Sequence, residues 1–183
     1  MPVYIALLRG INIGPHKRMK MEKLVASCAA CGWANAKTYI QSGNVVLKAP
    51  KISPDALAKK FETQILADFG FSADVIVRSR EELEKIVSGN PLLKMRGVDP
   101  EKLHVVFLSA PPEPAAVKKL ESHTLAPDQV RAAGKEIYFY FPNGVSGSSV
   151  WKHPLDKVLK ISSTMRNWNT VTKLLAMTKE TTK

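Results

Sequence analysis

The residues of this sequence best suited to binding an anion follow its first apolar run. Residues 9–14 read RGINIG, and Gly10 and Gly14 allow a tight loop that exposes backbone N–H groups. Basic side chains follow at once, namely His16, Lys17, Arg18 and Lys20. This pattern predicts a cradle for a phosphate or carboxylate before the next helix. The alternative is an ordinary loop with solvated lysines, since the spacing matches neither the dinucleotide-binding nor the Walker pattern.

A second polar segment lies at residues 39–44, which read YIQSGN. Gln41, Ser42 and Asn44 have side chains that can orient a ligand by hydrogen bonds. The alternative is turn chemistry, in which Ser42 and Gly43 form the turn and Asn44 bonds to nearby backbone. Ser42 is not predicted to be a nucleophile, because no base lies near it in the sequence.

A third polar segment lies at residues 166–170, which read RNWNT. Arg166 can pair with a carboxylate or phosphate through two N–H groups. The alternative is structural: Asn169 or Thr170 caps the last helix, and Trp168 fills the core.

The net charge of +11 is concentrated at the two ends of the sequence. Residues 1–48 carry a net charge of +6, residues 150–183 carry +5, and residues 49–149 are neutral overall. If the ends meet in the fold, they form one basic face for an anionic partner. The charge alone does not indicate an RRM, because the predicted strand at residues 44–47 lacks an aromatic platform.

Several other kinds of site are not predicted. Cys28 and Cys31 fall at the C-terminal end of a predicted helix, where the helix dipole does not activate a thiol, so we expect buried packing. The four histidines have no metal-ligand spacing. The sequence therefore predicts no metal and no cofactor. It has neither an apolar stretch of membrane-spanning length nor a signal-peptide pattern, and two cysteines make no disulfide framework, so we expect a cytoplasmic protein.

Apolar spacing and turn residues predict the elements that position these segments. Ser53 with Pro54 predicts the start of a helix that Gly70 ends, and Ser79 with Glu82 predicts a capping box at the start of the next helix. Through residue 87 the predicted order is β-α-β-β-α-β and then a helix, which is the ferredoxin-like split βαβ order. A stretch rich in turn residues follows, and a β-α-β-β-α order then partly repeats, with helical segments at residues 152–160 and 169–177. We predict an α+β fold with a ferredoxin-like subdomain at residues 1–90. A second α+β subdomain at residues 101–183 ends in C-terminal helices, the last of which is expected to pack back on the first subdomain.

The chain resembles the DUF1697 proteins, a bacterial family of unknown function, over about residues 3–175. The stretches that carry the resemblance are residues 6–14, 38–46, 90–91, 142–144 and 166–171. The resemblance implies a two-part α+β structure with a ferredoxin-like N-terminal part, and it implies no activity, cofactor or catalytic residue. Pro15 stands where the family's loop often has a second glycine, and proline removes one backbone donor.

The leading hypothesis is a protein that binds a phosphorylated or polyanionic ligand, with nucleic acid or nucleotide as the main candidates. One cleft between the N-terminal unit and the C-terminal helix is predicted to gather Arg9, Asn12, Gln41, Ser42, Asn44, Arg166, Asn167 and Asn169. A basic rim is predicted to extend it through Lys17, Arg18, Lys20 and Lys23. We expect no membrane partner, and the oligomeric state stays open.

Two alternatives to a binding protein stay open as well. The first is an enzyme that acts on a small anionic substrate, although Glu22 is the only acid in residues 1–48, so no carboxylate pair lies near the motifs. The second is a purely structural role, in which the three segments cap helices and pin the two halves together.

Overall fold

The structure is a computed structural model, and it describes residues 1–181. Contacts between residues divide the chain into two compact units. Unit 1 comprises Met1–Lys85 together with the chain from Lys173 onward, and unit 2 comprises Ile86–Thr172. The ranges 1–90 and 101–183 stay a prediction. Among the described residues no helix is long and apolar enough to cross a membrane.

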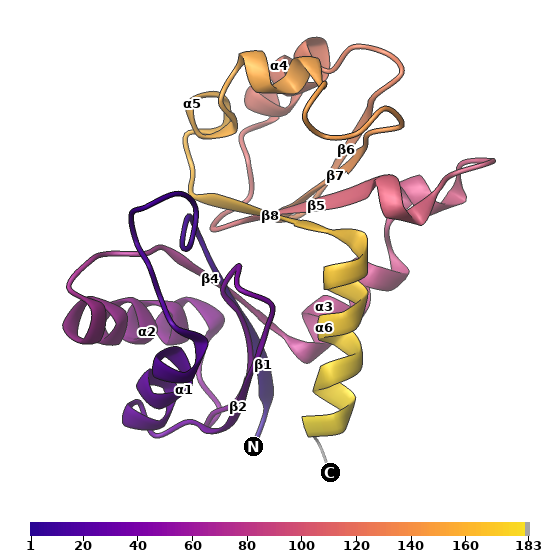
Figure 1. Ribbon diagram of the computed structural model, residues 1–183. Coiled ribbons are helices and arrows are strands. Elements are labelled where there is room, and N and C mark those ends of the chain that lie inside the picture. Colours follow the sequence, from indigo (N-terminus) through magenta and orange to yellow (C-terminus); the bar gives the residue numbers. More distant parts are fainter. Residues whose placement is uncertain (182–183) are drawn as a thin grey trace. The chain divides into compact units, whose positions relative to one another are not determined.

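Unit 1 is built on a four-stranded antiparallel sheet (Figure 1). Its elements are β1 (Val3–Leu8), α1 (Met21–Ala30), β2 (Ala34–Tyr39), β3 (Asn44–Lys48), α2 (Pro54–Phe69), β4 (Val75–Ser79) and the first part of α3 (Arg80–Ser88). The strand order is β2-β3-β1-β4, and every neighbouring pair is antiparallel. This order agrees with the predicted split βαβ arrangement.

The core of unit 1 lies between its sheet and the helices α1 and α2, which lie side by side on one face (Figure 1). Alternate residues of β1 face these helices, as the period of a strand requires. Tyr4, Ala6 and Leu8 pack there with Leu24 of α1 and Phe61 of α2. All six residues of β1 are buried, so the central strand is a rigid support for the loop that follows it.

The predicted boundaries of two helices in unit 1 are confirmed by their caps. Ser53 accepts a hydrogen bond from the N–H of Ala56 at the start of α2, and Gly70 ends that helix in the left-handed region at φ +74°. At the start of α3, Ser79 accepts from the N–H of Glu82, and the Glu82 carboxylate accepts from the N–H of Ser79 at 2.7 Å. This is the predicted capping box.

Unit 2 repeats the same topology around a second four-stranded antiparallel sheet, with strand order β6-β7-β5-β8. Its elements are η1 (Pro91–Lys94), η2 (Pro100–Lys102), β5 (Leu103–Leu108), α4 (Pro114–His123), β6 (Gln129–Ala133), β7 (Glu136–Tyr140), η3 (Ser149–Lys152), α5 (Leu155–Leu159), β8 (Ser163–Asn167) and the start of α6 (Trp168–Thr181). Helices α4 and α5 pack on one face of this sheet, over Val106, Ile137 and Phe139 (Figure 1).

The repeat extends to individual hydrogen bonds at the ends of the central strands. After β1, the N–H of Arg9 donates to the carbonyl of Asp74 at 2.9 Å, next to the start of β4. After β5, the N–H of Ser109 donates to the carbonyl of Ser162 at 3.0 Å, next to the start of β8. The two units therefore share strand register as well as strand order.

Two buried arginines occupy equivalent places in this repeat. Arg78 of β4 is paired with Ile5 of β1, and Arg166 of β8 is paired with Val105 of β5. Each guanidinium donates to the carbonyl of the residue before it, at 2.9 Å for Arg78 and 2.8 Å for Arg166. Strand pairing thus places an arginine at the same position in each unit.

One predicted helix and one missing strand are corrected by the structure. The helix predicted at residues 152–160 is two short pieces, η3 and α5, because Pro154 follows His153 and disfavours helical backbone there. Strand β8 was not predicted, since its sequence STMRN carries no alternating apolar pattern. Its pairing with β5 makes it a strand, and it completes the second β-α-β-β-α-β unit.

Candidate functional site

The connection between β1 and α1 is a long loop with several left-handed residues. Gly10, Asn12, Gly14 and Lys17 have φ between +51° and +64°. Glycine and asparagine tolerate this region, whereas lysine adopts it less readily. The N–H of Asn12 donates to the carbonyl of Lys17 at 3.1 Å, which closes the loop on itself. Residues 13–18 are exposed at the end of the sheet.

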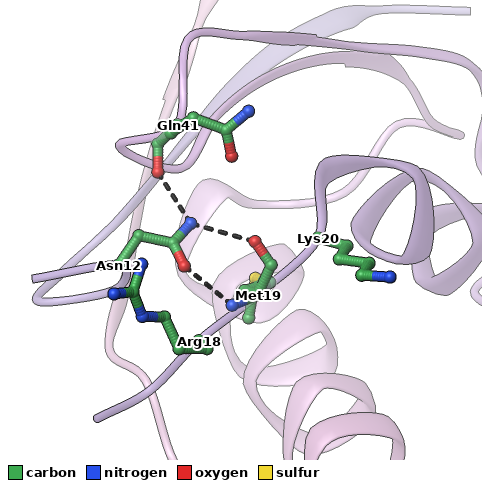
Figure 2. Close-up of a pocket in the computed structure, with 5 residues that line it drawn as sticks. All are labelled: Asn12, Arg18, Met19, Lys20 and Gln41. Atoms are coloured by element: carbon green, nitrogen blue, oxygen red, sulfur yellow. Dashed lines mark hydrogen bonds between the residues drawn. The ribbon is translucent and has the colours of Figure 1, made fainter. Parts of the chain in front are cut away.

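The Asn12 side chain holds this loop in place and joins it to the turn between β2 and β3 (Figure 2). Its carboxamide nitrogen donates to the carbonyls of Met19 and Gln41, both at 2.9 Å. Its carboxamide oxygen accepts from the N–H of Met19 at 2.7 Å. Three hydrogen bonds from one side chain therefore tie together segments that lie 29 residues apart in the sequence.

The turn between β2 and β3 requires glycine at position 43. Gly43 has φ +77°, and a Cβ atom there would lie 2.7 Å from the Leu8 Cβ and 2.7 Å from the Ile11 Cδ1. Its carbonyl accepts the N–H of Leu8 at 2.8 Å. The glycine thus lets the turn approach the end of β1 closely enough for the two loops to meet.

Asn44 begins β3 and is fully buried. Its carboxamide nitrogen donates to the Tyr39 carbonyl and to the Ser42 hydroxyl oxygen, both at 2.9 Å. These are the local bonds of a turn, as the structural alternative predicts for Asn44 and Ser42.

A hollow of about 590 Å³ opens where the two loops meet. The described residues that line it are Asn12, Arg18, Met19, Lys20 and Gln41. Figure 2 shows Arg18 and Lys20 extending to opposite sides of the Met19 backbone, with the Gln41 side chain beyond Asn12. Within residues 1–181 the side chains of Arg18, Lys20 and Gln41 have no hydrogen-bond or ion-pair partner.

The hollow also lies beside the start of α1, where Lys20 is the N-cap residue. The Lys20 side chain caps no backbone N–H, so the first N–H groups of α1 lack a side-chain acceptor at this position. No carboxylate or imidazole is among the described lining residues. The arrangement offers two cations and the carboxamide of Gln41, since both N–H groups of the Asn12 carboxamide are already donated to carbonyls. These groups suit anion binding and provide no general base.

The predicted basic rim divides into free and engaged side chains. Lys17, Arg18 and Lys20 are exposed. The Lys23 ammonium instead donates to the carbonyl of Asp68 and lies 4.8 Å from the centre of the Phe69 ring. Lys23 therefore holds α1 against α2, and three of the four rim residues remain available.

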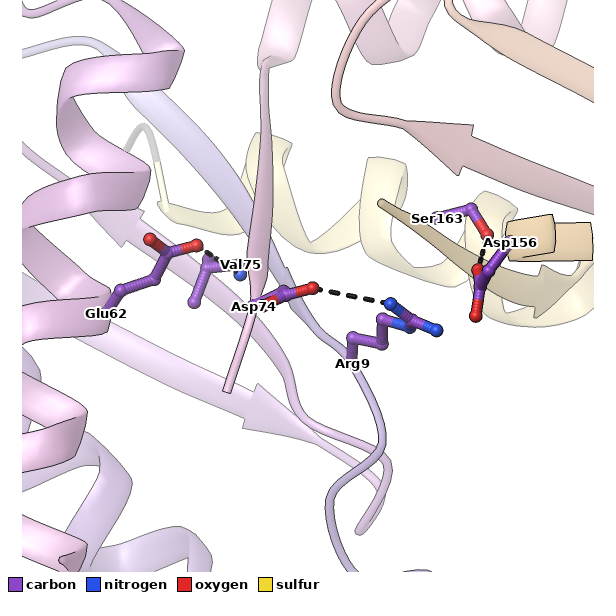
Figure 3. A network of polar contacts seen from close by, with 6 residues as sticks. All are labelled: Arg9, Glu62, Asp74, Val75, Asp156 and Ser163. Carbon is purple, nitrogen blue, oxygen red and sulfur yellow. Dashed lines mark hydrogen bonds and ion pairs between the residues drawn. The ribbon is translucent and has the colours of Figure 1, made fainter. Parts of the chain in front are cut away.

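Arg9 leaves β1 toward β4 and pairs with an acid (Figure 3). One of its terminal nitrogens lies 3.4 Å from the Asp74 carboxylate, and both side chains are partly exposed. Beside this pair, the Glu62 carboxylate of α2 accepts the N–H of Val75 at 2.9 Å. Figure 3 also labels a unit 2 contact, in which the Ser163 hydroxyl donates to the Asp156 carboxylate at 3.1 Å.

Arg166 lies in β8 of unit 2 and is only 8% exposed. Its guanidinium donates to the Thr164 hydroxyl at 2.7 Å and to the Met165 carbonyl at 2.8 Å. Burial lowers the pKa of Arg166 to about 10, because a poorly hydrated site disfavours the charged form.

The cap of the last helix is Asn167, and not Asn169 or Thr170 as predicted. The Asn167 carboxamide oxygen accepts the N–H of Thr170 at 2.8 Å, and α6 begins at Trp168. Asn169 is exposed in the first turn. The helix begins earlier than predicted because β8 runs directly into α6.

The structure brings together part of the predicted site. Asn12 and Gln41 line one hollow with Arg18 and Lys20, which were predicted only as a rim. Arg166, Asn167 and Asn169 belong to unit 2, and their convergence with the residues of unit 1 stays a prediction. No pattern in the sequence indicated that Met19 lines the hollow. The length of the loop was the available signal, since most connections in compact domains are shorter.

The two cysteines pack in the core of unit 1, as predicted. Both are free thiols. Burial raises the pKa of Cys28 to about 12, because apolar surroundings disfavour the thiolate. Burial also raises the pKa of Cys31. These thiols are therefore poor nucleophiles and poor redox groups at neutral pH.

The chain belongs to the DUF1697 family. The family model, described as a protein of unknown function, matches residues 1–138, so the RNWNT segment lies beyond the matched residues. Among solved structures, the chain is similar to a conserved bacterial protein, SP0830, from Streptococcus pneumoniae. The two are 22% identical with a TM-score of 0.78, over 97% of this chain and 98% of that one. This likeness shows the fold alone. No curated protein matches the chain.

Proposed function

We propose that the protein binds a phosphorylated or polyanionic ligand, with nucleic acid or nucleotide as the main candidates. The observation that carries the proposal is the hollow at the Asn12–Gln41 contact. There the cations of Arg18 and Lys20 stand beside a loop that three hydrogen bonds hold in place. A fixed loop with unpaired cations loses little conformational freedom when an anion binds.

The charge and the size of the region support an anionic ligand of nucleotide size. Residues 1–48 carry a net charge of +6, which raises the local concentration of anions. A hollow of about 590 Å³ lies within the range typical of small-molecule sites. Carboxamides such as that of Gln41 can both donate to and accept from a polar ligand, so they can orient it.

The wider set of residues remains part of the proposal. The proposal also assigns binding roles to Arg9, Ser42, Asn44, Arg166, Asn167 and Asn169. The local bonds of Asn44 and Asn167 also fit the structural alternative, so the hollow in unit 1 is the part of the set to test first.

A binding function is preferred to an enzyme because of the chemistry at the hollow. An acid–base reaction needs a carboxylate or imidazole within hydrogen-bonding reach of the substrate, and the described lining residues include neither. Chemistry that depends only on cations and oriented dipoles stays the alternative. We also propose a cytoplasmic location, which agrees with the two free cysteines.

The test is a fluorescence titration with single-stranded RNA, single-stranded DNA and nucleotides at two salt concentrations. The variant is the double substitution Arg18→Ala and Lys20→Ala. We expect about a tenfold or greater loss of affinity. For a single strand, the slope of log affinity against log salt should become shallower by about 1.4, since two phosphate contacts are removed.

The matched control is Lys118→Ala with Lys157→Ala, which removes two exposed cations from unit 2. It changes the net charge equally and should change the affinity little. Equal losses of affinity in both double variants would show that binding depends only on the net charge of the protein. An absence of salt-dependent binding to any of these ligands would end the proposal.

A further inference from the structure

Each of the two loops that meet at the hollow presents an exposed isoleucine. Ile13 is 75% exposed and Ile40 is 51% exposed. They follow Asn12 and precede Gln41 in the sequence, and these two residues are joined by the 2.9 Å hydrogen bond. The exposed part of each isoleucine gains nothing from the hydrophobic effect in the free protein, so this apolar surface is available to a ligand.

The backbone conformation of Ile40 is one that isoleucine rarely adopts, so stability of the fold does not explain why isoleucine occupies this position. Its φ is +52°, in the left-handed region that glycine and asparagine adopt most readily. A β-branched side chain is strained there, and at this position it is also half in solvent. Neither core packing nor backbone preference favours isoleucine at position 40, which points to a role in recognition.

We infer that the ligand of the hollow is a nucleotide unit whose base is not stacked in a duplex. The inference rests on the proposed function and specifies its ligand. Arg18 and Lys20 extend to opposite sides of Met19, so one of the two cations would contact the phosphate. Ile13 and Ile40 would pack against the flat face of the base. The Gln41 carboxamide would reach the hydrogen-bonding edge of the base. A duplex buries these faces, so it could engage only the cations.

A single-stranded nucleic acid and a free nucleotide share this chemistry. A membrane surface is the competing class of partner, since exposed apolar side chains among cations also suit anionic lipid. The hollow favours the nucleotide, because a discrete ligand fills a concave site with carboxamide lining, whereas a bilayer presents a broad surface.

The key variant is Ile40→Asn, which removes the apolar surface and places a residue that accepts the left-handed backbone. We expect the melting temperature to rise, as relief of strain requires. The affinity for a single-stranded oligonucleotide and for AMP should fall about fivefold or more, while the weaker affinity for pyrophosphate should not change. Leu125→Asn is the matched control, because Leu125 is a similarly exposed leucine (59%) in unit 2.

A second variant, Ile13→Asn, tests the same surface without the strained backbone. It should weaken binding of the oligonucleotide and of AMP in the same direction. Tighter binding of the oligonucleotide than of AMP assigns the site to a strand, and the reverse order assigns it to a free nucleotide; both support the inference.

Three results would overturn the inference. One is unchanged oligonucleotide binding by both isoleucine variants, and another is equally tight binding of the duplex with the same sequence. The third is a preference for vesicles of phosphatidylserine and phosphatidylcholine over the oligonucleotide. If the Arg18 and Lys20 double variant still loses affinity in the first two cases, the proposed function stands and only the nucleotide inference fails. Absence of binding to every anion tested ends both.

Discussion

In unit 1 the chain uses residues 9–20 to pass from β1 to α1, whereas in unit 2 it uses only residues 109–113 to pass from β5 to α4. The first connection carries four Lys or Arg residues and no acid. The second reads SAPPE and carries one acid and no Lys or Arg. The strands that hold both connections pair in the same order and register. The fold is therefore repeated, and the candidate site is a property of the loops of one repeat.

The turn between β2 and β3 in unit 1 also differs from the turn between β6 and β7 in unit 2. In unit 1 the Gly43 carbonyl accepts the N–H of Leu8 at the end of the central strand β1. Gly43 itself lies close against the side chains of Leu8 and Ile11. In unit 2 the equivalent carbonyl belongs to Lys135, in the turn between β6 and β7, where a Cβ atom on Gly134 would meet only one atom, at 3.8 Å. Only the hairpin of unit 1 is shaped to meet a neighbouring loop.

The substitution Gly43→Ala is expected to have the largest effect on stability, and it tests the difference between the two turns. The new methyl group would overlap Leu8 and Ile11 and would strain a left-handed backbone, so we expect a loss of about 2–4 kcal/mol in the free energy of unfolding. Gly134→Ala in the hairpin of unit 2 meets only one atom, at 3.8 Å, and should cost about 1 kcal/mol. Urea unfolding of both variants measures the difference. Equal losses would show that the two hairpins are equally tolerant.

A smaller effect is expected from Asn12→Ala, which removes the three hydrogen bonds that fix the loop of residues 9–20. Because the loop is partly exposed, we expect a loss of about 1–2 kcal/mol, together with weaker anion binding. Asn143→Ala is the control, since Asn143 is an exposed asparagine in a loop of unit 2. Hydrogen exchange of the Met19 amide reports the loosening directly. An unchanged exchange rate there would show that Asn12 does not hold the loop.

The equivalent helix caps should give smaller, matched effects. Ser79→Ala at the start of α3 and Asn167→Ala at the start of α6 each remove an acceptor for a backbone N–H. Each should lower the free energy of unfolding by about 1 kcal/mol. Thermal unfolding of the two variants compares them. A cost confined to one cap would break the equivalence of the repeats at this position.

The effect of mild acid should also distinguish the units. In unit 2, burial lowers the pKa of His104 and of His123 below the ordinary value of 6.5, and the neighbouring His153 and Lys119 lower that of His123 further. The unfolded state then binds more protons than the folded state below about pH 6.5, so unit 2 loses stability as the pH falls through this window.

Unit 1 should respond only at lower pH. Hydrogen bonds from Ser27 and Gln64 lower the pKa of Asp68 below its ordinary value of 3.8, so this contribution is present above that pH and is lost as the pH falls below it. Hydrogen exchange at pH 7 and pH 5 should therefore show reduced protection in β5 and α4 before β1 and α1. His123→Gln should weaken the pH dependence of unit 2, and a response of unit 1 at pH 5 would contradict the assignment.

The sequence predicted the elements that carry their own local signals. Ser53 with Pro54, Gly70, and the pair of Ser79 and Glu82 marked helix ends correctly, because capping depends on residues a few positions apart. The family was likewise identified, since it depends on the residues themselves.

Features that depend on distant partners were not predictable in the same way. Strand β8 is polar and exists through its pairing with β5, and the role of Asn12 depends on a carbonyl 29 residues away. Lys23 donates to the carbonyl of Asp68 because α1 packs against α2, whereas Arg18 and Lys20 have no side-chain partner among residues 1–181. A single sequence shows the residue types of a site, whereas the fold decides which of them remain free.

The division of the chain has a consequence for synthesis on the ribosome. Unit 1 includes Lys173 and the residues that follow it, but 87 residues of unit 2 are translated between Lys85 and this last segment. At typical elongation rates of about 5–20 residues per second, the first 85 residues wait roughly 4–17 s for the segment that completes their unit. During that interval the nascent chain carries the loop of residues 9–20 on an unfinished unit. Unit 2, contiguous in the chain, is the first of the two to be fully translated.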